Sequence, residues 1–281
     1  ITPEREWWDL NYYHLKVEVI PSEKRIVGSN TIKYTVLDDH KVMQIDLQAP
    51  LKITSVTQNG EVLEFTSEGN AHFITLKEAQ PIGSSGELTV YYEGQPREAV
   101  RAPWDGGFSW KKDANGTDFI ATSCQGLGAS VWWPCKDHMY DEVDSMDISV
   151  EVPEHLTDVS NGQLVKVDRN RKKQTRTFHW TVKNPINNYG VNLNIGDYVN
   201  WSETYEGEKG ALDVNYWALK VDEKKAREQF KEVPRMLEAF EYWFGPYPFY
   251  EDGYKLVQTP YLGMEHQSSV TYGNGFQNGY L

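Results

Sequence analysis

Short segments in which apolar and polar residues alternate fill the first two-thirds of the chain. In the first of them every second residue is apolar, at Tyr13, Leu15, Val17 and Val19. This period of two is typical of a strand with one buried face. Comparable apolar segments predict further strands at residues 32–36, 43–47, 63–65, 74–76, 88–92, 119–122, 146–152, 164–167 and 178–182.

Turn signals separate these segments about every ten residues, a spacing that is typical of an antiparallel β-sandwich. Asn59-Gly60 predicts a type I′ hairpin. Residues 97–118 are rich in glycine and proline and predict a long surface loop, and residues 184–197 predict a connector. We therefore expect a mainly β fold, with an N-terminal β-sandwich or saddle-like domain over residues 1–198.

The pattern changes in residues 199–281, which we expect to form a second domain. Residues 212–216 predict one more strand, and Asp222 is a candidate helix cap. Pro234 interrupts the helical segment that follows, which predicts either a kink or two helices with Pro234 in the first turn of the second. Gly245-Pro246 predicts the end of the helix. One apolar helix face is expected from Ala226, Phe230, Val233, Leu237 and Phe240.

The composition excludes some classes of function. A net charge of −13 argues against nucleic acid as a partner, because phosphate requires a basic surface. No apolar run approaches the roughly 20 residues that a membrane span needs. Ile1 in place of an initiator Met indicates that a preceding segment was removed. Cys124 and Cys135 are either two buried thiols or a disulfide.

Common catalytic motifs are absent from the sequence. No two histidines have the i, i+4 spacing of a helix-borne zinc site, although a site assembled from distant histidines and carboxylates stays open. A Gly-x-Ser-x-Gly nucleophile elbow and a phosphate-binding Gly-x-x-x-x-Gly-Lys loop are also missing. The acidic group of Asp137, Asp141, Glu142 and Asp144 indicates a solvated loop or, alternatively, a Ca²⁺ or structural role.

Two separated motifs give the chain a family resemblance. Tyr261-Leu262-Gly263-Met264-Glu265-His266 resembles the Gly-x-Met-Glu-Asn exopeptidase loop of the aminopeptidase N family of zinc metallopeptidases, which includes the leukotriene hydrolase branch. Earlier in the chain, Gln125 at the end of a strand and the segment Trp132–His138 resemble the family's Gln or Glu and its aromatic-Pro-Cys-x-Asp segment. In that family a His-Glu-x-x-His helix follows the loop and holds zinc, and this sequence has no such motif.

The resemblance implies roles for six substrate-binding residues. Gln125 would accept a hydrogen bond from the α-amine of the substrate, and Glu265 would pair with the same amine. The backbone of Gly263 and Met264 would hydrogen-bond an extended peptide, and Tyr261 would line the first side-chain pocket. His266 stands where the family has Asn and could donate a hydrogen bond while titrating near neutrality.

The sequence also departs from the family pattern. Leu262 replaces the first glycine of the loop, and Ser130 replaces an arginine that the family often has. For Gln125, Tyr261, Met264 and Glu265 the alternative is an ordinary packing or surface role. These departures leave the preferred N-terminal residue of the substrate open.

The resemblance implies that the chain is the N-terminal part of a zinc aminopeptidase, ending in the β-rich start of a thermolysin-like α+β catalytic domain. Zinc would belong to the full-length parent, with no catalytic residue and no metal in this fragment, which we expect to be inactive alone. The expected partners are peptides with a free N-terminal amine. The alternatives are a non-catalytic, peptidase-like scaffold that binds peptides or proteins, and an unrelated adhesion or carbohydrate-binding sandwich.

Three further properties are less closely defined by the sequence. For the compartment, an exported protein, periplasmic or extracellular, is favoured. The oligomeric state is unknown. Residues 260–281 are expected to move or to bind another molecule, because the apolar surface there would lack its usual helices.

Overall fold

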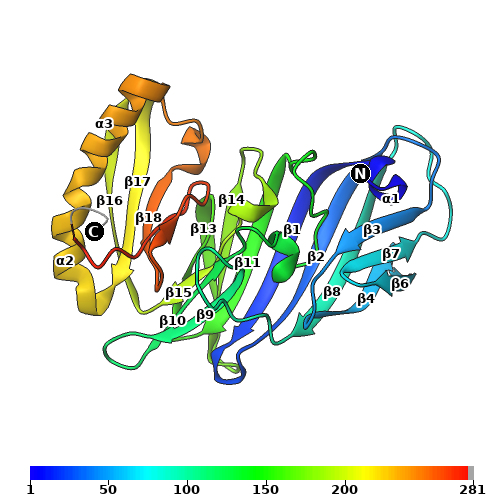
Figure 1. Cartoon of the computed structure of the whole chain (residues 1–281), viewed down its shortest axis with the longest axis horizontal. Helices are drawn as coiled ribbons and strands as arrows, with labels where there is room; N and C mark the ends of the chain where they lie inside the picture. Colours follow the sequence, from blue (N-terminus) through cyan, green and yellow to red (C-terminus); the bar gives the residue numbers. More distant parts are fainter. Residues whose placement is uncertain (278–281) are drawn as a thin grey trace.

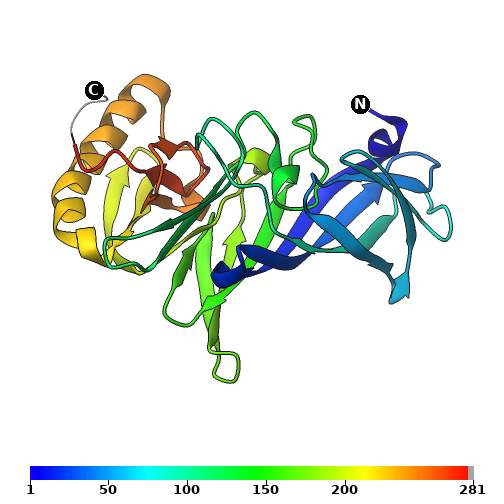
Figure 2. The same ribbon diagram turned by 60° about the horizontal axis from the view of Figure 1, so that its bottom comes forward.

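The computed structural model describes residues 1–277, which form an elongated, strand-rich molecule (Figure 1). The short helix α1 (Pro3–Glu6) lies towards one end, and helices α2 (Glu223–Gln229) and α3 (Val233–Phe244) lie at the other. Figure 2 shows that the sheets follow one another along the long axis between these ends. The fold is mainly β, as predicted.

Most strands of the N-terminal part form one eight-stranded sheet, in the order β13-β14-β11-β1-β2-β8-β4-β5. Neighbouring strands are antiparallel except β1 and β11, which run parallel and pair Tyr13 with Met146. This one parallel pair departs from the predicted antiparallel arrangement, because apolar alternation is the same for both strand directions. The strands are β1 (Trp8–Ile20), β2 (Arg25–Val36), β4 (Lys52–Gln58), β5 (Glu61–Val62), β8 (Ser85–Gly94), β11 (Ser145–Pro153), β13 (Gln163–Asn170) and β14 (Thr175–Val182).

Two smaller sheets complete the N-terminal part. One has the order β3-β7-β6 and the other the order β12-β15-β10-β9. Buried residues from all three sheets, such as Leu15, Ile45 and Ile120, belong to one hydrophobic core. The strands are β3 (Val42–Asp46), β6 (Glu64–Glu68), β7 (Ala71–Thr75), β9 (Gly107–Lys112), β10 (Asp118–Ser123), β12 (Thr157–Val159) and β15 (Asn194–Gly196).

Three of the strands in these two sheets were not predicted: β9, β12 and β15. Strand β9 lies inside residues 97–118, where a loop was expected, and β15 lies inside the expected connector. Gly107 begins β9 with a φ of +138°, and a Cβ there would lie 2.4 Å from the carbonyl oxygen of Arg97. Glycine is therefore required by a close backbone approach at this position, rather than by a flexible loop. All three residues of β15 are buried, so it shows no alternation.

The predicted hairpin at Asn59-Gly60 is confirmed. Both residues have positive φ, at 53° and 81°, and they join β4 to β5 with Gln58 paired to Glu61. Positive φ at both central residues is the signature of a type I′ turn, which matches the twist of the flanking strands.

The C-terminal part contains a five-stranded sheet in the order β16-β17-β18-β20-β19. Helices α2 and α3 pack on it, and a short 3₁₀ turn at Phe230–Glu232 separates them. Pro234 lies in the first turn of α3, as one of the two predicted alternatives has it. The strands are β16 (Tyr198–Gly207), β17 (Gly210–Leu219), β18 (Tyr254–Gln258), β19 (Gly263–Met264) and β20 (Val270–Tyr272).

The predicted apolar helix face is buried only in part. Ala226, Phe230, Val233 and Leu237 are in the core, but Phe240 is 53% exposed. Three further aromatic residues of α3 are also exposed: Tyr242, Trp243 and Phe244. The helix therefore carries an aromatic surface near its C-terminal end that no described residue covers.

The strands on the two sides of residue 198 belong to different sheets. The core nevertheless continues across this point, because Tyr198, Leu219 and Val257 belong to the same cluster as the N-terminal core. The division into domains at residue 198 stays a prediction. So does the expected mobility of residues 260–281, of which residues 278–281 lie outside the described part.

Two further findings concern single features of the sequence. Cys124 and Cys135 are both buried free thiols. Within residues 1–277, no helix combines the length and the apolar character that crossing a membrane requires.

Candidate functional site

The predicted exopeptidase loop connects β18 to β20 and is itself well bonded. Thr259 N donates to Tyr272 O at 2.8 Å, and Gly273 N donates to Leu262 O at 3.0 Å. Gly263 has a φ of +133°, and a Cβ there would lie 2.6 Å from Thr271 O. Glycine is therefore required at this position because the backbone of β20 approaches it closely.

Strand β19 lies at the edge of its sheet. Gly263 and Met264 pair with β20 on one side, and no described strand pairs with them on the other. The outward-facing backbone groups of an edge strand can hydrogen-bond an extended peptide. The side chain of Met264, in contrast, is 6% exposed and packs with Ala121 and Tyr261, so its own role is packing.

Tyr261 is also a packing residue in this structure. It is 6% exposed, and its hydroxyl donates to the carbonyl oxygen of Thr122 in β10 at 2.9 Å. Burial raises the pKa of its phenol. Tyr261 therefore ties the loop to the N-terminal part, and its side chain does not present the pocket surface that the resemblance implied.

Glu265 is exposed at the surface, as expected of an amine-binding carboxylate. Its Oε1 accepts a hydrogen bond from the hydroxyl of Tyr189 at 3.2 Å. Burial, and then the charge of Glu265, raises the pKa of the Tyr189 phenol, so the phenol stays protonated and donates. Glu265 also borders a largely apolar cavity of about 510 Å³ between the loop and the C-terminal half of α3, with Phe240 and Phe244 in its wall.

Gln125 is exposed in a second cavity, of about 600 Å³. The walls of this cavity include Asp137, Met139 and Tyr189. Tyr189 therefore lines the cavity of Gln125 and at the same time hydrogen-bonds Glu265. The two predicted amine-binding residues, Gln125 and Glu265, therefore both lie near Tyr189.

His266 does not have the role that the resemblance implied. Its side chain is 0% exposed, and neither ring nitrogen hydrogen-bonds another described group. Burial lowers the pKa of His266 from 6.5 to about 3, so the expectation of titration near neutrality is wrong. The ring faces the interior because the segment that follows it packs on the N-terminal part, where Gln267 O accepts from Asn161 Nδ2.

The acidic group near residue 140 has structural roles. Asp141 pairs with the fully buried Lys136, and Asp137 accepts from the backbone N–H of Ser130 at 3.0 Å. Ser130, which stands where the family often has arginine, is 3% exposed and accepts from Gln48 through its hydroxyl at 3.0 Å. The Ca²⁺ alternative gains no support, because Asp137 and Asp141 are already bonded within the chain.

Within residues 1–277, no group of three or more His, Cys, Asp or Glu side chains comes together in a way that could hold a metal ion. The donor set of the described residues therefore does not fit zinc. What the arrangement offers chemically is binding: an exposed carboxylate and an exposed amide that border two cavities, together with an edge strand.

A family model, the Peptidase M1 N-terminal domain, matches residues 10–189, which is more than half of the chain. The chain belongs to the M1 peptidase family. No curated protein matches it.

Solved structures of M1 zinc metallopeptidases share the fold of this M1 chain. A substituted variant from Deinococcus radiodurans has a TM-score of 0.77 at 20% identity, covering 95% of this chain and 60% of that one. A second, from the same organism and bound to the substrate Tyr-Ser-Ala, has a TM-score of 0.79 at 20% identity, covering 97% and 62%. A two-domain M1 zinc metallopeptidase variant bound to L-tryptophan has a TM-score of 0.79 at 20% identity, covering 98% and 62%. This chain thus spans about 60% of the length of these structures.

Tyr189 is the main residue of the candidate site that the sequence analysis of this M1 chain did not predict. It lies in a short 3₁₀ turn at Asn188–Gly190, and its N–H donates to Asn187 Oδ1 at 3.2 Å. Its only sequence signal is an aromatic residue in a polar, Asn-rich connector, which predicts nothing about Glu265, 76 residues away. A contact of this kind is visible only once the two parts are docked.

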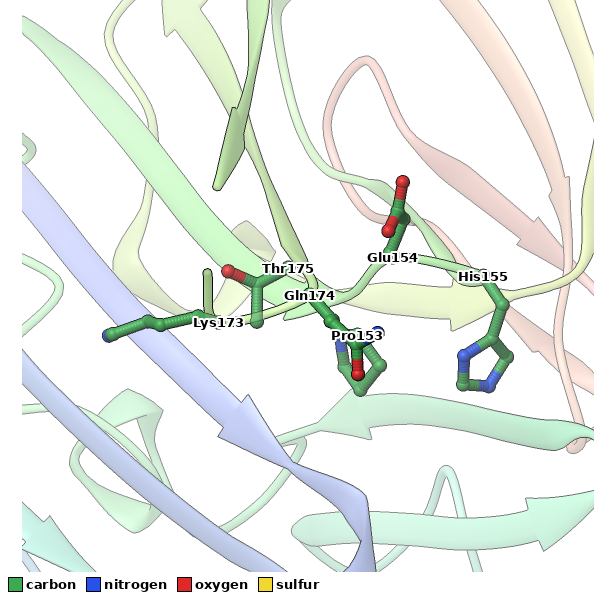
Figure 3. Close-up of a pocket in the computed structure, with 6 residues that line it drawn as sticks. All are labelled: Pro153, Glu154, His155, Lys173, Gln174 and Thr175. Carbon is green, nitrogen blue, oxygen red and sulfur yellow. The ribbon is translucent and has the colours of Figure 1, made fainter. Parts of the chain in front are cut away.

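Another cavity, of about 580 Å³, lies where β11 ends and β14 begins (Figure 3). Its walls include Glu154, His155 and Lys173, and Figure 3 shows Lys173 extending away from the other two. Lys173 pairs with Glu18 and Glu151, and Glu154 pairs with Arg169. The charged groups of this cavity are thus already paired, and none of them is a predicted site residue of the M1 chain.

Proposed function

We propose that this M1 chain is the N-terminal part of a zinc-dependent aminopeptidase and that it supplies recognition of the free α-amine of peptide substrates. This proposal rests mainly on the position of Tyr189, which lines the cavity of Gln125 and donates a hydrogen bond to Glu265 at 3.2 Å. Glu265 pairs with the ammonium group, Gln125 accepts a second hydrogen bond from it, and the edge of β19 aligns the peptide backbone. The bound Tyr-Ser-Ala, L-tryptophan and L-arginine of related M1 structures all carry a free amine, which supports this assignment.

The chain alone is expected to bind but not to cleave. Cleavage would require zinc in the full-length parent, where the metal would supply Lewis-acid chemistry and an activated water molecule. The described residues do not fit the metal, so the purified 281-residue chain should show no zinc-dependent hydrolysis.

The test uses the full-length natural protein and a panel of aminoacyl anilides, with and without a zinc chelator. We expect chelator-sensitive release from free substrates and little from their N-acetylated counterparts. No release by metal-replete, folded protein would contradict the proposal and favour a non-catalytic scaffold that binds peptides. Equal release from free and acetylated substrates would contradict the amine-recognition role alone.

Replacing Tyr189 by Phe in the full-length protein tests the contact that carries the proposal. The variant loses the hydroxyl that orients Glu265, and this hydroxyl acts on the amine only through that carboxylate. We therefore expect KM for free aminoacyl anilides to rise about three- to tenfold, which corresponds to about 0.7–1.4 kcal/mol, as for loss of one ordinary hydrogen bond. The kcat should change less, because the phenol contacts the binding carboxylate. Tyr12→Phe is the matched control, since it also removes a hydroxyl that donates to a carboxylate, Asp147 Oδ2 at 2.6 Å, within the eight-stranded sheet. An unchanged KM in Tyr189→Phe would show that the hydroxyl does not act on substrate binding.

A further inference from the structure

A buried asparagine of the N-terminal part lies beneath the Tyr189–Glu265 contact. Asn161 follows β12 in the corner Ser160–Gly162, which we call the Asn161 corner, and its side chain is 0% exposed. Its Nδ2 donates to Gly190 O at 2.7 Å and to Gln267 O at 2.6 Å. Its Oδ1 accepts from Asn192 N at 2.9 Å. The N–H of Asn192 requires an oxygen opposite it, which fixes the orientation of the amide.

The two carbonyl groups that Asn161 binds belong to the two segments of the candidate site. Gly190 follows Tyr189 directly in the chain, and Gln267 lies two residues after Glu265. At the surface the same two segments meet again through the hydrogen bond between Tyr189 and Glu265. The segments are therefore joined at two levels, by Asn161 in the interior and by Tyr189–Glu265 at the surface.

Neighbouring hydrogen bonds add to this attachment. Gly162 N donates to Ser268 Oγ at 2.8 Å, and Asn192 Nδ2 donates to Ser269 O at 3.2 Å. The side chain of Lys255, which is 4% exposed, donates to Gly162 O. The segment after Glu265 is thus attached to the Asn161 corner by several buried hydrogen bonds, in a position where water cannot replace them.

We infer that Asn161 is a positioning residue for free-amine recognition: it sets the place of the Glu265 carboxylate by joining its segment to that of Tyr189. This inference rests on the proposed function. Only an amide fits the role, because Asn161 must donate two N–H groups to two carbonyl oxygens and also accept one hydrogen bond. The isosteric Asp would place an acceptor oxygen opposite those carbonyl groups.

The test compares Asn161→Asp with the unsubstituted protein, both as the full-length, metal-loaded enzyme. The measured quantity is the ratio of kcat/KM for a free aminoacyl anilide to that for its N-acetylated form. We expect this ratio to fall roughly ten- to hundredfold, mainly through KM for the free substrate, as for a misplaced binding group. Combining Asn161→Asp with Glu265→Gln should lower the ratio no further than Glu265→Gln alone, because both act through one carboxylate.

Asn194→Asp is the matched control. Asn194 is also 0% exposed, and its Nδ2 donates to Val159 O at 3.0 Å within the N-terminal part. This variant should lose thermal stability but keep the selectivity ratio. Should Asn161→Asp fail to fold, Asn161→Ser removes the same two donors without introducing a charge.

Several outcomes would overturn the inference. One is a folded Asn161 variant with an unchanged ratio, and another is an equal loss of selectivity in Asn194→Asp. A third is a selectivity ratio in the double variant Asn161→Asp, Glu265→Gln that falls by the product of the two single losses. Absence of chelator-sensitive release by the unsubstituted protein would overturn the proposed function and this inference together, whereas release with an unchanged ratio overturns this inference alone.

Discussion

Replacing Glu265 by Gln in the full-length protein is expected to lower kcat/KM for free aminoacyl anilides by about 10- to 150-fold. This factor corresponds to about 1.5–3 kcal/mol for a hydrogen bond between charged groups. Glutamine keeps the size of the side chain and can still accept from the hydroxyl of Tyr189, so the loop should stay in place. The loss should appear mostly in KM, because in the proposed role the carboxylate binds the amine in both the ground state and the transition state.

The acetylated substrates provide the internal comparison for Glu265→Gln. They carry no ammonium group, so their slow turnover should be unchanged by the substitution. Glu251→Gln is the matched variant, because Glu251 is also an exposed acid of the C-terminal part and accepts from an uncharged group, Asn184 Nδ2, at 3.3 Å. If Glu265→Gln lowered the rates of free and acetylated substrates equally, Glu265 would be acting on something other than the amine.

The parts of the fold that were predictable are those with a local cause. The strand at residues 13–19 and the Asn59-Gly60 turn follow from side-chain alternation and from backbone conformations that few residues adopt. The parallel pairing of β1 with β11 joins Tyr13 to Met146 and has no local cause. The direction of such a pair is set by the whole topology, which a period of two does not encode.

The candidate site shows the same division. Glu265 is exposed where a motif placed it, and Gly263 has the conformation that requires glycine. Tyr261 and His266 were expected at the substrate, and both are buried. Their burial depends on the docking of the loop against Thr122 and the Asn161 corner, more than a hundred residues earlier in the chain. Residues next to each other in the motif therefore face opposite sides, and only tertiary contacts decide which.

These contacts give the N-terminal part a direct function in the proposed enzyme. Tyr189 and Gln125 belong to it, and in our proposal they complete the amine-binding surface whose carboxylate, Glu265, is supplied by the C-terminal part. The core is also continuous between the two parts, through Tyr198 and Val257. A change in the docking of the two parts would therefore alter amine recognition even if every residue of the Gly-Met-Glu loop were kept.

Because His266 is buried, the free energy of unfolding of the chain is expected to decrease as the pH falls. Its folded-state pKa is about 3, against an ordinary 6.5, and burial is the cause. Between these two values the unfolded chain binds a proton that the folded chain does not, so stability is full above pH 6.5 and falls as the pH falls. At about 1.4 kcal/mol per unit, the free energy of unfolding should decrease by about 2–3 kcal/mol from pH 6.5 to pH 4.5 through this group.

The variant His266→Phe isolates this contribution, because it keeps a flat ring in the same buried space and cannot bind a proton. Urea unfolding of the 281-residue chain at pH 6.5 and at pH 4.5 gives the acid-induced loss for each protein, and other titrating groups cancel in the comparison. We expect the loss to be about 2–3 kcal/mol smaller in His266→Phe than in the unsubstituted chain. His155→Phe makes the same exchange at an exposed position and should not reduce the loss. An equal acid-induced loss in His266→Phe and in the unsubstituted chain would mean that His266 reaches solvent, and the ring could then face the substrate as the motif implied.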